Sequence, residues 1–279
     1  MEKVEAIRIP IKTIKSGNSS VIEYLKEVWQ YRHLIWIFAY QEFKVQYVQT
    51  RLALFWVLLR PLIILAIFTF VFDNMIHIAE LSYPYPLFAI SGLLIWNNFS
   101  FMVNNTGTAI VSNQSMIKKY YFPRIILILS KSLIGLLEFA VTFLLLLTLM
   151  LVMRFPFGVQ FFLFPFFVLV TLLIGGTVSI WVNALTIKHR DLHHFVPTLV
   201  GFLIWLTPVF YPVTLLPQKF AFLIYLNPMA GAMQGFRWTV LGDPALSIWY
   251  LPSFIVIGVL FIIGFLLFIR AESEIADYI

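Results

Sequence analysis

Histidines are the first candidates for chemistry in this sequence. His189, His193 and His194 lie close together, with His189 and His193 at i,i+4 spacing. A metal site needs a third or fourth ligand, and only Asp191 is near. Histidines in a charged turn are more often solvated or turned toward a partner, so we expect no metal site. The chain has no cysteine, which excludes thiolate ligands, disulfides and a cysteine nucleophile.

Two isolated charges fall inside long apolar stretches, Arg60 and Glu138. Ionisable groups at membrane depth are functional candidates by default. A proton relay would show several acids or histidines, so the pattern argues against an ion-driven transporter. It favours either a structural pair or two charges that line a wet cavity. No Ser-His-Asp order or paired carboxylates appear in a context typical of a pocket, and no GxxxxGK[ST] phosphate loop is present. The sequence therefore predicts neither hydrolytic catalysis nor P-loop nucleotide binding.

Composition places the chain in a membrane. Hydrophobic residues make up 61% and charged residues 11% of the 279 residues, against about 25% charged in soluble domains. The net charge of +6 is explained by basic cytoplasmic loops, without nucleic acid as a partner. The first twenty residues have no apolar core, so no cleavable signal peptide is expected.

The hydropathy pattern predicts an all-α membrane protein with six spans, at about 52–72, 87–111, 125–153, 161–187, from 195 onward, and 248–269. Polar residues fill the later half of the second span, at Asn97, Asn98, Ser100 and 104–106. Lys and Arg concentrate before residue 52, in loops 112–124 and 188–194, and at Arg270, so both termini should be cytoplasmic. We expect a tail and interfacial helix over 1–50, the six-span domain over 51–270, and a cytoplasmic tail over 271–279.

An amphipathic helix should precede the first span. Ser20 to Glu23 fits a capping box, and Val21, Leu25, Val28 and Trp29 then share one face. The apolar cluster at 34–40 is too short to cross a membrane. The helix either lies along the membrane interface or packs on the protein's own spans, and the two interpretations are compatible.

The stretch 195–237 begins as a span and is then interrupted by Pro208, Pro212 and Pro217, with a further turn at Asn227-Pro228. Proline removes a backbone donor and clashes with the preceding turn, so this is not one straight helix. Broken backbone at membrane depth is tolerated only where it is buried in protein or lines a cavity. The stretch therefore indicates a path across the membrane. Clustered aromatic residues there and elsewhere are typical of membrane belts and core packing, and they also suit sugar rings.

Several motifs occur in a fixed order along the chain. They are QEFKVQYVQTRLALFWVLLRP at 41–61, SGLLIWN at 91–97, Asn113 with KKYYFPR at 118–124, Arg190-Asp191, TPVFYP at 207–212, NPM at 227–229 and Phe236-Arg237. Together they resemble the permease subunits of ABC transporters that export polysaccharides and polyol phosphates, over about residues 20–270. Gln46, Val48 and Ala53 depart from that pattern, where basic residues and glycine are usual.

The resemblance implies a homodimer of six-span subunits with a re-entrant pair of short helices between spans five and six. It also implies two copies of a separate ATPase subunit, which would bind ATP and magnesium, so this chain would be neither an enzyme nor a cofactor protein. The cargo would be a lipid-linked glycan (O-antigen, capsule or teichoic acid) crossing the bacterial cytoplasmic (inner) membrane, with membrane lipids as further partners.

The resemblance also suggests roles for individual residues. Charged residues of the cytoplasmic segments, whose simpler role is to retain positive charge inside, become contacts for the ATPase: Glu42, Lys44, Lys118, Lys119, Arg124, Arg190 and Asp191. Phe55, Trp56, Trp205 and Tyr211 would line the channel, and Arg51 and Arg60 would meet the lipid head group at its entrance. The outer gate would contain Pro212, Asn227, Pro228 and Arg237.

Two rival functions stay open at this point. A permease of the same type for a drug or small lipid would have the same fold. A membrane-embedded glycosyl- or acyltransferase would need a catalytic acid or histidine at the membrane surface, and His193-His194 is the one candidate that the sequence offers.

Replacing both His193 and His194 with alanine distinguishes the transferase from a permease. We expect glycan at the cell surface to stay close to wild type, because neither side chain has a chemical step to perform in a permease. Immunoblotting of surface glycan, normalised to the amount of protein in the membrane, measures this. Loss of the glycan at normal protein level would favour the transferase.

Overall fold

The computed structural model describes residues 21–48, 53–72, 81–186, 191–215 and 217–278, and the regular structure in these ranges is helical. The all-α prediction is confirmed for this part of the chain. The first half contains α1 (Val21–Gln30), α2 (Arg32–Phe43), a π-helical segment (Lys44–Val48), α3 (Ala53–Thr69), α4 (Tyr85–Phe101), a second π-helical segment (Met102–Thr106), α5 (Ala109–Ser112), α6 (Gln114–Ile117) and α7 (Ile125–Val152). The second half contains α8 (Phe164–Thr186), α9 (Leu192–Leu206), α10 (Gln218–Leu226), α11 (Pro228–Leu241) and α12 (Leu251–Tyr278), with 3₁₀ turns at Val159–Leu163, Val213–Leu215 and Ile248–Tyr250.

Five helical stretches in the described residues are long and apolar enough to cross a membrane: Phe55–Phe72, Tyr85–Thr106, Ile125–Val152, Val159–Thr186 and Ile248–Arg270. They coincide with the first four and the sixth of the expected spans. The fifth expected span is represented by α9, which has 15 residues and is therefore about 22 Å long. A hydrocarbon core is about 30 Å thick, so α9 does not cross it alone. The count of six spans stays a prediction.

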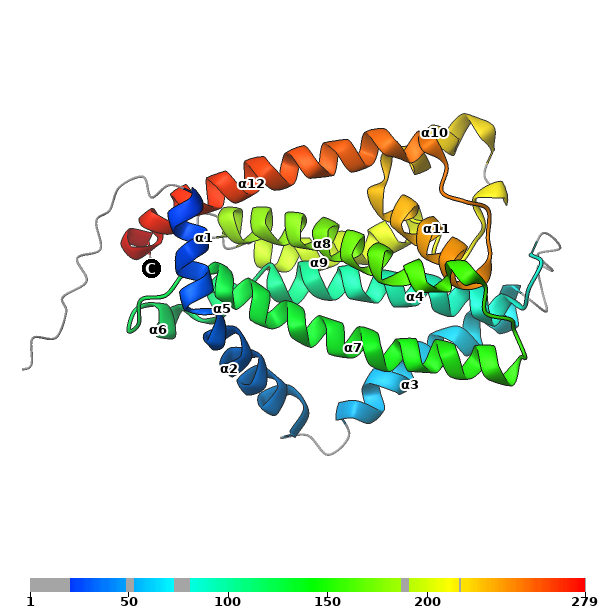
Figure 1. Cartoon of the computed structure of the whole chain (residues 1–279), viewed down its shortest axis with the longest axis horizontal. Helices are drawn as coiled ribbons and strands as arrows, with labels where there is room; N and C mark the ends of the chain where they lie inside the picture. Colours follow the sequence, from blue (N-terminus) through cyan, green and yellow to red (C-terminus); the bar gives the residue numbers. More distant parts are fainter. Residues whose placement is uncertain (1–20, 49–52, 73–80, 187–190, 216, 279) are drawn as a thin grey trace, which may run out of the picture.

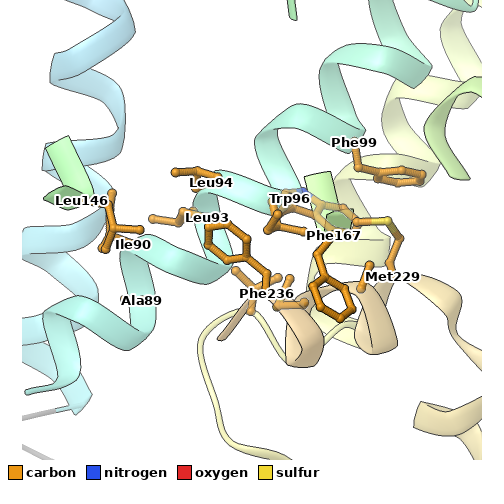
Figure 2. Close-up of a cluster of buried hydrophobic side chains, with 14 of the residues drawn as sticks. Ala89, Ile90, Leu93, Leu94, Trp96, Phe99, Leu146, Phe167, Met229 and Phe236 are labelled. Atoms are coloured by element: carbon orange, nitrogen blue, oxygen red, sulfur yellow. The ribbon is translucent and has the colours of Figure 1, made fainter. Parts of the chain in front are cut away.

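Helix α4 is the centre of the bundle. Its span, Tyr85–Thr106, is 83% buried, whereas Phe55–Phe72, which contains α3, is only 11% buried. In Figure 1, α4 runs between α7, α8 and α11. Figure 2 shows side chains of α4 gathered with Phe167 of α8 and with Met229 and Phe236 of α11. The first part of α4 is almost wholly apolar, and a helix of this kind belongs inside a bundle. The asparagines toward its end are therefore placed inside the bundle as well.

Small residues let α11 approach its neighbours closely, as is common between helices in membranes. A Cβ at Gly235 would lie 1.9 Å from a ring carbon of Phe167, and one at Gly231 would lie 2.8 Å from the ring of Phe254. The small residues of PMAGAMQG at 228–235 therefore form a packing surface. Through this surface α11 packs closely against α8 and α12.

The two ends of the bundle differ. Figure 1 shows α1, α5, α6 and the C-terminal end of α12 at one end, and α10 and α11 at the other. On α1, Tyr24 is 5% exposed and packs on the bundle, while Leu25 and Trp29 are 52% and 68% exposed. The helix predicted to be amphipathic thus has one side on the protein and an apolar side that is free to meet lipid. Ser20 of the expected capping box lies outside the described residues.

Alanine at Gly235 tests the packing of α11. The added methyl group has no room beside Phe167, so overpacking should lower stability by about 1–3 kcal/mol. Thermal unfolding of the purified protein in detergent measures the change. Alanine at Gly201 in α9 is the matched control, because nothing lies within 4 Å of its Cβ position. This substitution should raise stability by about 1 kcal/mol, since alanine favours the helix over glycine. Equal effects at the two glycines would contradict the close packing.

Candidate functional site: a polar cavity and an interrupted helix

A cavity of about 440 Å³ lies among α3, α4, α7 and the first π-helical segment. It is mainly polar, although it is surrounded by apolar spans. Residues of α4 and its π-helical extension line it at spacings of three, four and seven, which puts them on one helix face. The lining residues are Gln46, Tyr47, Trp56, Val57, Arg60, Pro61, Leu94, Asn97, Asn98, Ser100, Phe101, Asn104, Asn105, Gly135, Glu138, Phe139 and Thr142.

Both isolated charges of the sequence, Arg60 on α3 and Glu138 on α7, line this cavity. The Glu138 carboxylate accepts hydrogen bonds from Tyr47 Oη at 2.5 Å and from Gln46 Nε2 at 3.1 Å. Both bonds go to Oε1, so Oε2 remains as an acceptor. Of the two interpretations left open by the sequence, the structure favours charges that line a cavity. No local pattern indicates that Tyr47 and Gln46 hold Glu138, because 91 and 92 residues separate them from it.

The asparagines of the cavity are incompletely paired. Asn98 is 3% exposed, and neither its Nδ2 nor its Oδ1 has a hydrogen-bond partner. Asn104 donates to Ser100 Oγ at 3.1 Å, but its Oδ1 has no partner. An unsatisfied buried polar group costs about 1–3 kcal/mol. Such groups in a native protein require an explanation, and a site for a ligand or an ion is one of them.

Two π-helical segments adjoin the cavity. Lys44–Val48 supplies Gln46 and Tyr47, and Met102–Thr106 supplies Asn104 and Asn105. π-helical turns occur frequently at functional sites, because the extra residue in the turn re-aims the side chains that follow. The π-helical turns and the unpaired asparagines thus both indicate that this cavity is a functional site.

The break after α9 is held by a buried arginine. Arg237 of α11 is 4% exposed and lies 3.5 Å from the centroid of the Phe88 ring. Its Nη1 donates to Pro208 O at 2.9 Å, and its Nη2 donates to Val209 O at 2.7 Å and to Phe88 O at 3.2 Å. The end of a helix leaves carbonyl groups without intrahelical partners. A guanidinium group offers five donors in a fixed fork, which suits it to collect them.

A second polar contact ties the same break to α11. Asn227 Oδ1 accepts from the backbone N–H of Met229 at 3.0 Å and so caps α11, while Nδ2 donates to Thr207 Oγ1 at 3.0 Å. Pro228 occupies the first position of α11, where its missing donor costs nothing. Pro212 is half-buried before the 3₁₀ turn Val213–Leu215. The four predicted gate residues thus lie in or beside the junction of α9, α10 and α11, and their role as a gate stays a prediction.

The four residues predicted to line the channel form two pairs, which lie near opposite ends of α3. Trp205 lies 6.1 Å from Phe68 of α3, centroid to centroid, and Tyr211 Oη donates to Trp205 O at 2.9 Å. Phe55 and Trp56, 55% and 54% exposed, lie at the other end of α3. Twelve residues of helix from Trp56 to Phe68 correspond to about 18 Å. The structure therefore brings two of the four together and separates them from the other pair.

The predicted contacts for an ATPase are spread over several elements. Lys118 and Lys119 are exposed directly after α6, Asp191 is exposed just before α9, and Lys44 is exposed after α2. Glu42 forms an ion pair with Lys131 Nζ at 3.6 Å. Arg190, like the predicted entrance residue Arg51, lies outside the described residues.

Arg124 has an internal partner that sequence reasoning missed. Its backbone N–H and its Nη1 donate to Glu272 Oε1 at 2.8 and 3.3 Å, and Tyr24 Oη donates to Glu272 Oε2 at 2.5 Å. Burial raises the pKa of the Glu272 carboxyl, and the hydrogen bonds from Tyr24 and Arg124 oppose that rise. The cluster joins α1, the start of α7 and the end of α12. No local pattern could reveal it, because 148 residues separate Arg124 from Glu272.

Within the described residues, no group of three or more histidines, cysteines and carboxylates could hold a metal ion. His189 lies outside that part of the chain, so the predicted absence of a metal site is not tested at the His189–His194 loop.

Comparison with known proteins identifies the family. Residues 33–241 match the family model of the ABC-2 type transporter. The chain belongs to the ABC-2 type transporter family. It is therefore a multi-pass membrane transport protein, and family membership implies a separate ATP-binding subunit. The resemblance that the ordered motifs suggested is confirmed.

Curated relatives of this ABC-2 type transporter chain are named as permeases. The O-antigen export system permease protein RfbA of Klebsiella pneumoniae is 26% identical over 253 residues, which cover 88% of this chain and 94% of the relative. The Myxococcus xanthus protein of the same name is 28% identical over 223 residues, covering 78% and 84%. A permease name for both relatives agrees with transport without catalysis by this chain.

Replacing Arg237 with lysine tests whether the guanidinium group holds the break after α9. Lysine keeps the charge but loses the planar fork, so several carbonyl oxygens lose a donor. We expect a loss of about 2–4 kcal/mol in stability, measured by thermal unfolding in detergent. The control is lysine at Arg32, whose Nη1 donates to Trp29 O on an exposed helix face. An unchanged unfolding temperature at position 237 would exclude this role.

Proposed function

We propose that this chain is the channel-forming subunit of an ABC transporter that exports a lipid-linked polysaccharide across the bacterial inner membrane. Similarity to O-antigen export permeases over most of the chain carries the proposal. ATP hydrolysis on the separate ATP-binding subunit drives transport, and that subunit binds ATP and magnesium. This chain needs no cofactor of its own. Capsular polysaccharide and teichoic acid are cargoes of the same chemical class.

Two copies of the chain assemble with two copies of the ATPase. Helices α3 and α9 support this arrangement, because they expose large apolar side chains on the outside of the single chain. Large apolar side chains exposed on them are Phe55, Trp56, Leu58, Leu62, Ile63, Ile67, Phe195, Leu199, Phe202, Trp205 and Leu206. Such surface meets either lipid tails or a second copy.

The chain crosses the membrane six times with both termini in the cytoplasm. In this arrangement α9 and the turn after it form the fifth crossing, and α10 and α11 form a re-entrant pair on the outer side. The basic loops support the orientation. So does the position of α1, α6 and the end of α12 at one end of the bundle (Figure 1). Residues 1–50 and 271–279 are then cytoplasmic or interfacial, and 51–270 form the transmembrane domain.

Transport follows from a change in packing between the two copies. The conformational change that ATP binding causes in the ATPase subunit is transmitted through the exposed residues near α2, α6 and the start of α9. The glycan passes along the interface between copies, against the aromatic faces of α3 and α9, which suit the apolar faces of sugar rings. Arg51 and Arg60 meet the phosphate groups of the lipid carrier on entry. The junction of α9, α10 and α11 closes the outer side.

The proposal is tested by purification and reconstitution. A tagged copy of the chain should co-purify with an ATPase. Lipid-linked glycan extracted from the producing strain should raise the rate of ATP hydrolysis by this complex, and a drug or a small lipid should leave that rate unchanged. Failure of the glycan to stimulate hydrolysis, together with stimulation by a small lipid, would favour the rival cargo.

Alanine at both Trp205 and Tyr211 tests the lining. We expect surface glycan to fall several-fold, because sugar rings lose aromatic faces to pass along. Quantitative immunoblotting of surface glycan measures the change at equal protein level. Alanine at Trp249, which is 68% exposed near α12, is the matched control and should leave export unchanged. Normal export by the Trp205 and Tyr211 double variant would refute the lining assignment.

A further inference from the structure

The polar cavity among α3, α4 and α7 shares Trp56 and Arg60 with the proposed path between two copies, but its asparagines and Glu138 have no part in that path. It nevertheless combines a buried carboxamide without partners at Asn98, a second unpaired oxygen at Asn104 and two charges, Arg60 and Glu138. Asn98 is 3% exposed and lines the cavity. Polar groups of this kind are rarely kept inside a membrane protein unless they face a ligand, a partner or water.

The hydrogen-bonding capacity of these groups selects the chemistry of a ligand. A carboxamide offers both donors and an acceptor, so its full satisfaction needs groups that accept and donate. A hydroxyl group does both, a phosphate without a proton only accepts, and an acyl chain does neither. Glu138 Oε2 adds an acceptor and Arg60 adds donors. The requirement is met by a ligand rich in hydroxyl groups, or by water.

The remaining lining and the size agree with a sugar. Trp56, Phe101 and Phe139 bring aromatic rings to the same cavity, and sugar rings have apolar faces of C–H groups that pack on such rings. The volume of about 440 Å³ lies within the range of about 300–1,000 Å³ that is usual for small-molecule sites.

We propose that this cavity binds a sugar unit of the lipid-linked glycan at membrane depth. Asn98 and Asn104 hydrogen-bond its hydroxyl groups, Glu138 accepts from a further hydroxyl through Oε2, and Trp56 and Phe101 contact its apolar faces. The inference rests on the proposed export of a lipid-linked glycan and assigns that cargo a binding site within each subunit.

The experiment exploits the absence of cysteine from the chain. Ser100→Cys places a single thiol in the cavity with almost no change in shape, in the full transporter in native membranes. N-ethylmaleimide, which crosses membranes but reacts with the ionised thiol, reports whether the position is wet and accessible. Membranes come from a strain that makes the glycan and from one in which the first sugar transfer to the lipid is blocked.

We expect labelling at position 100 to be about tenfold slower in membranes that contain the glycan. Adding Asn98→Leu should abolish this protection, because the ligand loses its carboxamide. Leu144→Cys, 62% exposed on the apolar side of α7, should stay unlabelled in both strains, and Val159→Cys, 89% exposed, should label equally in both. Co-purification of each variant with the ATPase shows that it is folded.

Equal labelling of position 100 in the two strains would show a cavity that holds water only, and no labelling in either would show a cavity closed to water. Each result would overturn the site. Deletion of the gene separates this from the proposed function. If deletion abolishes surface glycan and the wild-type gene restores it, equal labelling refutes the cavity site alone. If deletion leaves surface glycan unchanged, the proposed export function itself fails.

Discussion

The contact of Arg237 with the backbone beyond α9 is the interaction on which the interrupted half of this protein depends. In a bilayer no water reaches free carbonyl groups, so a broken helix is stable only where the protein supplies donors. Arg237 donates to Phe88 O, Pro208 O and Val209 O from a position that is 4% exposed. Because α11 carries the arginine, α11 has to lie against both α4 and the end of α9. The small residues of α11 then allow that close approach.

Asn227 stabilises the other side of the break, also through hydrogen bonds. Its carboxamide caps α11 and also reaches Thr207, so the corner between α10 and α11 and the end of α9 are fixed together. Prolines in this region do not need to donate, which is why they accumulate where the helix ends. The interruption after α9 is therefore a defined structural element that is stabilised by its own buried hydrogen bonds.

Much of this architecture could be predicted from the sequence, since it follows from hydropathy and from proline. The positions of the long spans, the interruption after α9 and the presence of Arg60 and Glu138 at membrane depth were all predictable. Their partners were not. Arg237 meets backbone carbonyls, and a single sequence gives no signal for a carbonyl acceptor. Glu138 finds Tyr47, and Glu272 finds Arg124 and Tyr24, across 91, 148 and 248 residues.

Helix α3 is the element through which the cavity and the interrupted helix influence each other. At one end it carries Trp56 and Arg60, which line the cavity. At the other, Phe68 stacks on Phe210 beyond the break, with ring centroids 3.7 Å apart and an interplanar angle of 6°.

Within the single chain, the span that contains α3 is also the least buried of the five, so a shift of α3 breaks fewer contacts inside the subunit than a shift of α4, α7 or α8 would. Helix α3 is continuous through Pro61 between these two ends. Movement of α3 that widens or narrows the cavity would therefore be felt at the aromatic stack beside the Arg237 contact. The two polar features of this protein, far apart along the chain, are thus joined by the least buried of the five spans in its described residues.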